Sequence, residues 1–310
     1  MLIVQSKSTD VYRNLAGEEW LLDHAPHLPV LLLYVNSPCV VIGKNQNPWR
    51  ECRLSLMEKE GVPLARRISG GGAVYHDEGN LNFGVIVPRT EYREEKQYEL
   101  IFQTLEATAL RHSVLSRMGK NALAIAGKKF SGQAFCFRGQ HVLHHGTLLV
   151  NSDLDRLNRY LGSEIDGIET KAVASVPATV ANLSSAFYNP PRPAATPPVE
   201  GSLYGAIPSF GGVPERRGGL PGLTVEKLSS ALIETFCEMY EKGGRVEEWK
   251  GDRVPEAELL PSIGRNVSND WKLNHTPRFQ VTLNGQTLEV EKGLVTNLDG
   301  SPPFEEWVKK

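Results

Sequence analysis

The triple glycine Gly70-Gly71-Gly72 follows a pair of arginines and lies inside a stretch, 64–88, of alternating strand-like segments. Glycine has no Cβ atom, so backbone here can approach a ligand closely and aim successive N–H groups at an anion. Arg66 and Arg67 add fixed positive charge just before the run. We therefore expect a β-containing core that carries a phosphate or carboxylate site at this loop. A tight hairpin without a ligand is the alternative for a glycine run taken alone.

A second segment, 127–134, contains paired lysines between β-like stretches, and His144-His145 follows in the next one. In an adenylation step a carboxylate attacks a phosphate, and negative charge accumulates on both groups. Lys129 could neutralise that charge. A solvated turn is the alternative for the lysines. Neighbouring residues of a strand point to opposite faces, so the two histidines are not expected to bind one metal ion.

Apolar spacing and turn residues predict several helices and strands. Residues 245–310 are expected to form a loop and two or three strands. The predicted helices cover 10–20, 54–61, 93–112 and 224–240, and the predicted strands cover 31–34, 39–43, parts of 64–88 and 123–150, 279–283 and 287–290.

The stretch 189–222 differs in composition from the rest and holds eight of the twenty prolines. No apolar period survives in it, which indicates a Pro/Gly-rich loop or linker. We therefore expect a main domain over 1–188, a helix over 223–244 that completes or bridges it, and a short C-terminal accessory domain over 245–310.

Composition excludes several classes of partner. Lys and Arg number 34 against 36 acids, so no global field would recruit nucleic acid or an anionic membrane. No apolar run approaches the roughly 20 residues of a membrane span. The N-terminal residues show no basic or long apolar leader, so a cytoplasmic location is expected. The four cysteines form no CxxC pair and are expected to be reduced thiols.

Three motifs together resemble the lipoate–protein ligase and lipoyltransferase family. They are Arg-Arg-x-Ser-Gly-Gly-Gly-x-Val-x-His-Asp-x-Gly-Asn from residue 66, Lys-x-Ser-Gly-x-Ala from residue 129 and His-His-x-Thr-Leu-Leu from residue 144. This chain matches all three in order and at the family spacing. The resemblance implies an α+β fold with mixed β-sheets and flanking helices, as in biotin and lipoate ligases, with 1–188 as the catalytic domain.

The resemblance also implies a set of site residues, with Lys129 as the catalytic one. Val41, Gly43 and Val74 are weaker candidates for a slot around the apolar tail. The adenylate or ATP would lie against Arg67, Gly72, Ala73, Val74, Tyr75, His76 and Lys129. Lipoate would lie against Ser69, Gly70, Gly71, Asn80, Lys129, Ser131, Gly132, His145, Gly146 and Thr147. No metal-ligating residue is implied.

The chemistry implied by the resemblance has two halves. Lipoate would attack the α-phosphate of ATP, with Mg²⁺ assistance, to form lipoyl-AMP and pyrophosphate. A lysine of an acceptor would then take the lipoyl group while AMP leaves. The implied acceptors are the lipoyl domains of 2-oxoacid dehydrogenases or the glycine-cleavage H protein. No side-chain nucleophile is needed, so catalysis would be positioning plus electrostatics.

Two departures from the family pattern leave the first half open. Pro177 stands where family ligases usually carry an arginine, and Ala122 follows Asn121 where the family has Asn-Asp. A lipoyltransferase that uses preformed lipoyl-AMP is therefore the main alternative to a ligase. A cysteine-dependent octanoyltransferase would use Cys136, and a non-catalytic lipoate binder is a further alternative. Biotin ligation is disfavoured because its Gly-Arg-Gly-Arg-type loop does not occur in this sequence.

Overall fold

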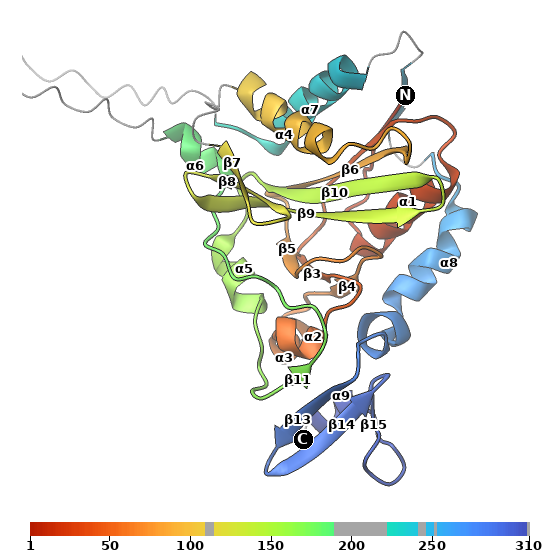
Figure 1. Cartoon of the computed structure of the whole chain (residues 1–310), viewed down its shortest axis with the longest axis vertical. Helices are drawn as coiled ribbons and strands as arrows, with labels where there is room; N and C mark the ends of the chain where they lie inside the picture. Colours follow the sequence, from red (N-terminus) through yellow and green to blue (C-terminus); the bar gives the residue numbers. More distant parts are fainter. Residues whose placement is uncertain (109–114, 189–221, 241–245, 251–252, 309–310) are drawn as a thin grey trace, which may run out of the picture.

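The computed structural model describes residues 1–108, 115–188, 222–240, 246–250 and 253–308 (Figure 1). Within them, one mixed sheet of eight strands forms the centre of the molecule. In spatial order its strands are β12 (Glu247–Lys250), β1 (Leu2–Gln5), β2 (Val30–Tyr34), β6 (Asn80–Pro88), β10 (His141–Leu149), β9 (Lys128–Arg138), β8 (Ala122–Ile125) and β7 (Leu115–Met118).

Two helices, α4 (Glu94–Ala107) and α7 (Val225–Tyr240), cover one face of this sheet (Figure 1). Apolar residues of α7 recur at the three- and four-residue spacing that places them on one side of a helix. Leu228, Leu232 and Phe236 are fully buried there, in one cluster with Phe83 of β6. The predicted helices over 93–112 and 224–240 are therefore confirmed within the described residues.

A smaller sheet lies on the opposite face and contains β4 (Leu64–Arg66), β3 (Cys39–Ile42) and β5 (Val74–His76) (Figure 1). Helix α1 (Val11–His24) begins after Asp10, whose side chain accepts from the Arg13 amide at 2.7 Å, as expected for an N-cap. The predicted strands 31–34 and 39–43 both exist. They belong to different sheets, so the chain crosses between the two sheets at residues 35–38.

A four-stranded sheet near the C-terminus forms the accessory domain: β11 (Glu169–Thr170), β13 (Phe279–Leu283), β14 (Gln286–Glu291) and β15 (Leu294–Val295). Helix α9 (Phe304–Val308) packs on it, and the rings of Phe279 and Phe304 meet Trp49 of α2 (Pro48–Glu51) at 5.5 and 5.1 Å. The short helices α3 (Leu54–Lys59), α5 (Leu154–Tyr160) and α6 (Leu183–Tyr188) complete the main domain.

The prediction of a loop after residue 245 is wrong for residues 256–267. These residues form helix α8 (Glu256–Val267), and a π-helical turn (Asp270–Asn274) follows it. Pro261 inside α8 disfavours a helix locally. Packing against α1 stabilises it instead, with Arg265 paired to Glu19. Strand β12 also joins the central sheet beside β1. The linker 189–222 lies outside the described residues except for Gly222, and the domain boundaries stay predictions.

Candidate active site

A cavity of about 860 Å³ lies between the large and small sheets. Its wall combines β2, β3, β5, β9 and β10 with the glycine run and with segment 172–178. Many of the residues expected to hold an adenylate or lipoate line it. They are Val41, Arg67, Gly71, Gly72, Ala73, Val74, His76, Lys129, Gly132, His145, Gly146 and Thr147.

Lys129 is the second residue of β9 and lines the cavity. Its amide donates to Thr179 O at 2.8 Å and its carbonyl accepts from Ala181 N at 2.9 Å, which ties β9 to the chain that follows segment 172–178. The Lys129 side chain lies over Gly132, where an added Cβ would come within 3.2 Å of Nζ. Burial, and then repulsion from Arg67, lower the pKa of Lys129 from its usual range. A bound anion would offset this shift, because its negative charge stabilises the protonated lysine.

The two neighbouring arginines serve different parts of the molecule. Arg67 is buried, and its Nη2 donates to Gly70 O at 2.6 Å and to Gly72 O at 2.8 Å. These two bonds hold the backbone of the glycine run in place. Arg66 points away, and donates to Lys44 O at 2.8 Å and to Lys272 O at 2.7 Å. Arg66 therefore joins the main domain to the C-terminal segment, while Arg67 shapes the cavity wall.

A buried chain of hydrogen bonds supports Arg67. Its Nε donates to Ser69 Oγ at 3.1 Å, Ser69 Oγ contacts His145 Nε2 at 2.6 Å, and His145 Nδ1 contacts Glu18 Oε1 at 2.7 Å. Glu18 is 1 % exposed and also accepts from the Tyr34 hydroxyl at 3.4 Å. The arginine and the carboxylate thus compensate each other in a region of low dielectric.

The paired histidines point to opposite faces of β10. His145 lines the cavity, whereas His144 stacks on Phe135 with ring centroids 4.6 Å apart. His144 Nε2 lies 2.6 Å from Gln133 Oε1. Burial lowers the pKa of His144 to about 3, so its ring is neutral, and it packs in the core.

Gly71 and Gly43 are glycines for geometric reasons. Gly71 has φ +88°, a left-handed conformation, and a Cβ there would come within 2.8 Å of Arg67 Nη2. A Cβ at Gly43 would lie 2.2 Å from the carbonyl oxygen of Gly71. The strand β3 and the glycine run can approach each other only because these side chains are missing.

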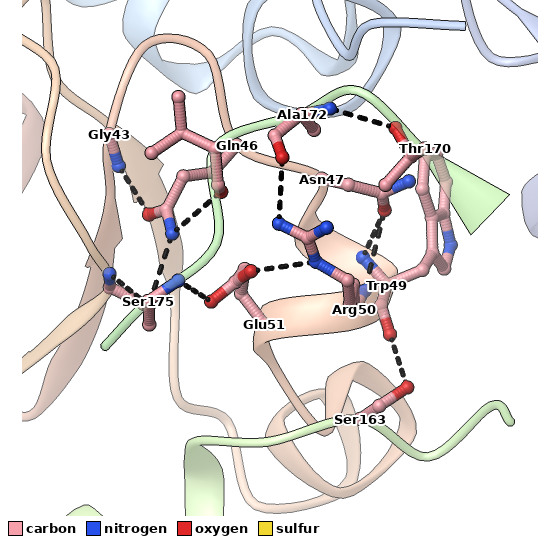
Figure 2. A network of polar contacts seen from close by, with 12 residues as sticks. Gly43, Gln46, Asn47, Trp49, Arg50, Glu51, Ser163, Thr170, Ala172 and Ser175 are labelled. Atoms are coloured by element: carbon pink, nitrogen blue, oxygen red, sulfur yellow. Dashed lines mark hydrogen bonds and ion pairs between the residues drawn. The ribbon is translucent and has the colours of Figure 1, made fainter. Parts of the chain in front are cut away.

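Segment 172–178, of which residues 173–178 line the cavity, forms the opposite rim and is not part of a strand. It is held by a backbone hydrogen bond, from Val173 N to Asn45 O at 3.0 Å, and by several side chains (Figure 2). Ser175 Oγ accepts from the Ala73 amide at 2.9 Å and from Gln46 Nε2 at 3.1 Å. The Ser175 amide donates to Glu51 Oε2 at 3.0 Å, and Arg50 Nη2 donates to Ala172 O at 3.0 Å. The loop 43–51 thus positions this segment against the glycine run.

The remaining expected site residues do not line the cavity. Ser69 and Gly70 lie behind the wall as partners of Arg67, and Gly43 lies behind Gly71. Tyr75 points to the other side of the small sheet, where its ring packs on Tyr160. Asn80 donates to Asn82, and Ser131 accepts from Gln133. Whether any of these six contacts a ligand stays a prediction.

The sequence analysis did not identify several residues that line the cavity or that support its wall from behind. Glu18 lies beside Glu19 on a helix and resembles an ordinary surface acid. Tyr34 and Asn82 also line the cavity, as does Lys120, which is exposed. The family resemblance also extends over residues 36–52, which include Gln46 and Glu51, but it implies no role for either residue. Their contacts with Ser175 span 129 and 124 residues, beyond the reach of a local pattern.

Cys136, the candidate nucleophile of the octanoyltransferase alternative, does not line the cavity. Its pKa is raised by burial, which disfavours the reactive thiolate. No group of three His, Cys, Asp or Glu in the described part of the chain could hold a metal ion. Among the same residues, no helix is long and apolar enough to cross a membrane.

A family model described as the lipoyl protein ligase A/B catalytic domain matches residues 10–196, more than half of the chain. The chain belongs to this family. It is 44% identical over 287 residues to the mitochondrial lipoyl amidotransferase LIPT1 of Mus musculus, covering 90% of this chain and 67% of that one. It is 32% identical over 284 residues to a lipoate-protein ligase A of Psychrobacter cryohalolentis, covering 89% and 73%.

The crystal structure of P. falciparum LipL1 with lipoate superposes with a TM-score of 0.67 at 26% identity, covering 96% of this chain and 81% of that one. The expected α+β fold with mixed sheets and a C-terminal accessory domain is thereby confirmed. The chain is an enzyme of the lipoate–protein ligase and lipoyltransferase group.

Proposed function

We propose that this enzyme transfers a lipoyl group from lipoyl-AMP to the side chain of an acceptor lysine. The observation that carries the proposal is Lys129, a cation without a carboxylate partner among the described residues, in a cavity with the glycine run. The cavity volume, about 860 Å³, is within the range of small-molecule sites and suits a ligand with an apolar tail and an anionic centre.

In the transfer step, the amine nitrogen of the acceptor lysine forms a bond to the acyl carbon, and the bond from that carbon to the phosphate oxygen breaks. The electron pair leaves with AMP, and the amine gives up one proton to water. Negative charge develops on the acyl oxygen and then on the departing phosphate. Lys129 and the glycine-run amides would stabilise that charge, which is why no cysteine nucleophile is required.

ATP-dependent formation of lipoyl-AMP is the second candidate activity. It places more negative charge in the site than transfer does, because pyrophosphate must be stabilised as it leaves. Pro177 and Ala122 line the cavity where the family pattern has a charged residue. The cations in the cavity wall are Arg67, Lys120 and Lys129 among the described residues, and Arg67 is engaged by backbone carbonyls. Mg²⁺ would arrive on the ATP phosphates.

The acceptor is proposed to be a lipoyl domain of a 2-oxoacid dehydrogenase or the glycine-cleavage H protein. The names of the two relatives, a lipoyl amidotransferase and a lipoate-protein ligase, support a protein acceptor. The expected cytoplasmic location is a prediction only, because the mouse relative is named mitochondrial.

The decisive experiment offers an apo lipoyl domain to the enzyme with either synthetic lipoyl-AMP or lipoate plus Mg-ATP. We expect a lipoyl mass increment with lipoyl-AMP alone. Modification in both mixtures would make the enzyme a ligase. No modification in either, with a lipoyl domain that a known ligase can modify, would refute the proposed function.

A further inference from the structure

His76, at the end of β5, has an unexplained polar atom in the cavity wall. Its side chain lines the cavity and is only 3 % exposed. Its Nε2 has no hydrogen-bond partner among the described residues. Buried polar atoms are bonded in the great majority of cases, so an unpartnered atom of a side chain that lines a ligand cavity is a candidate for a contact with the ligand.

The tautomer of His76 follows from a chain of hydrogen bonds that begins at the backbone carbonyl of Ser8. Asn14 Nδ2 donates to Ser8 O at 2.9 Å, and a carbonyl can only accept, so the orientation of the Asn14 amide is fixed. The same Nδ2 donates to Asn36 Oδ1 at 2.7 Å, which leaves Asn36 Nδ2 facing His76 Nδ1 at 2.9 Å. Because an amide nitrogen only donates, His76 Nδ1 is the acceptor and its proton is on Nε2.

We propose that Asn14 and Asn36 are positioning residues that hold His76 as the Nε2–H tautomer, and that this N–H donates to an oxygen of the bound acyl adenylate. The inference rests on the proposed function. The resemblance already places His76 near the adenylate, and the inference adds its tautomer and the two residues that orient it. Neither asparagine lines the cavity.

The surroundings of His76 keep it neutral. Burial, then the positive charge of Arg67 and the neighbouring His145, lower the pKa of His76 to about 3. A neutral donor suits a wall that already contains Arg67, because it can stabilise a ligand oxygen without adding another repelling charge beside Lys129. Its orientation is fixed before the ligand arrives, so no reorganisation is needed on binding.

The test is the Asn14→Asp variant, which leaves the cavity wall unchanged. A carboxylate at residue 14 only accepts, so the Asn36 amide must turn to donate to it and present its oxygen to His76 Nδ1. The proton then moves to Nδ1. Nitrogen NMR of ¹⁵N-histidine-labelled protein reports the tautomer directly, with the His76 signal assigned by its loss in His76→Gln. Calorimetry measures the affinity for a sulfamoyl analogue of lipoyl-AMP.

We expect Nε2–H in the wild type, Nδ1–H in Asn14→Asp, and about a tenfold loss of analogue affinity. If Asn14→Asp does not fold, the wild-type tautomer and the affinity of His76→Gln, with a similar expected loss, decide the matter. His144→Gln is the matched control, because His144 is equally buried but outside the cavity. It should keep wild-type affinity.

An Nδ1–H wild type would overturn the inference, as would undiminished affinity in His76→Gln or in an Asn14→Asp variant whose tautomer has switched. Those results would leave the proposed function intact, provided that the wild type binds the analogue. A wild type that does not bind the analogue would refute both.

Discussion

The glycine run 70–72 and segment 172–178 are two irregular parts of the wall of one cavity, called the first and the second wall, yet they are held in different ways. The first is held by Arg67, a buried cation that donates to the carbonyl oxygens of the glycine run and offsets the charge of Glu18. The second is held at its edge by Gln46 and Glu51, through hydrogen bonds to Ser175 (Figure 2). Segment 172–178 is also largely exposed, and Val176 is 84 % exposed.

This difference indicates that one part of the wall contributes mainly to the stability of the fold and the other mainly to ligand affinity. Removing a buried charge leaves its partner uncompensated in a low dielectric, so the first wall is part of what keeps the protein folded. Removing a contact at the second wall frees a segment with little buried apolar surface, which can move without global unfolding. We therefore expect damage to the first wall to lower stability and damage to the second to lower ligand affinity.

The strongest test of this contrast compares Arg67→Ala with Arg50→Ala. Arg67→Ala removes the charge that offsets buried Glu18 and the donor to three backbone carbonyls, those of Val41, Gly70 and Gly72, so the free energy of unfolding should fall by about 3–5 kcal/mol. Arg50 is partly exposed, and the buried Glu51 carboxylate that it bonds keeps the Ser175 amide as a donor, so loss of Arg50 should cost less, about 1–2 kcal/mol. Urea denaturation of both variants measures the two values. Similar losses would end the distinction between the walls.

Lys129 lies where the two walls meet, and its substitution should affect rate rather than stability. Lys129→Ala removes a preorganised charge and should lower the rate of lipoyl transfer by roughly 10² to 10³-fold. Lys120→Ala is the matched control, since Lys120 lines the same cavity but is exposed to solvent. Single-turnover transfer from lipoyl-AMP measures both. A Lys129→Ala enzyme as fast as Lys120→Ala would contradict the role given to Lys129.

Acid should act on the first wall through His76. Burial lowers its pKa from 6.5 to about 3, so between these values the unfolded chain binds a proton that the folded protein does not. The free energy of unfolding should therefore fall as pH drops from about 6.5 toward 3, by up to about 1.4 kcal/mol per pH unit for each such histidine. His144 contributes in the same sense. Urea denaturation at pH 6.5 and 5 should show a smaller difference in His76→Gln, and an unchanged one would exclude His76 as a source.

The sequence predicts the wall elements that depend on local chemistry. Asp10 caps a helix, the glycine run needs missing side chains, and Lys129 and His145 belong to compact motifs. It does not predict contacts between distant, ordinary-looking residues. Glu18 acquires its role only when α1 packs beneath His145, and Glu51 only when Ser175 reaches it across 124 residues. Helix α8 likewise depends on packing that outweighs Pro261.

The smallest expected effect concerns Glu51→Gln, at the second wall. Glu51 accepts from the Ser175 amide at 3.0 Å, and a neutral amide forms a weaker bond there than a carboxylate. A loss of about 1 kcal/mol corresponds to roughly fivefold weaker binding of the lipoyl-AMP analogue, with little change in stability. Calorimetry and urea denaturation of the same sample separate the two quantities.

Glu164→Gln is the control for that substitution, because Glu164 also accepts from backbone amides, those of Ser55 and Leu56, at 3.0 and 3.2 Å. Its partners belong to α3 and do not line the cavity. If the charged acceptor matters only for helix or loop stability, both variants should lose similar stability and keep wild-type affinity. If Glu51 instead holds Ser175 against the Ala73 amide, only Glu51→Gln should bind the analogue more weakly. Equal affinities in the two variants would mean that the second wall is positioned without Glu51, leaving Gln46 and the Ala73 amide to hold Ser175.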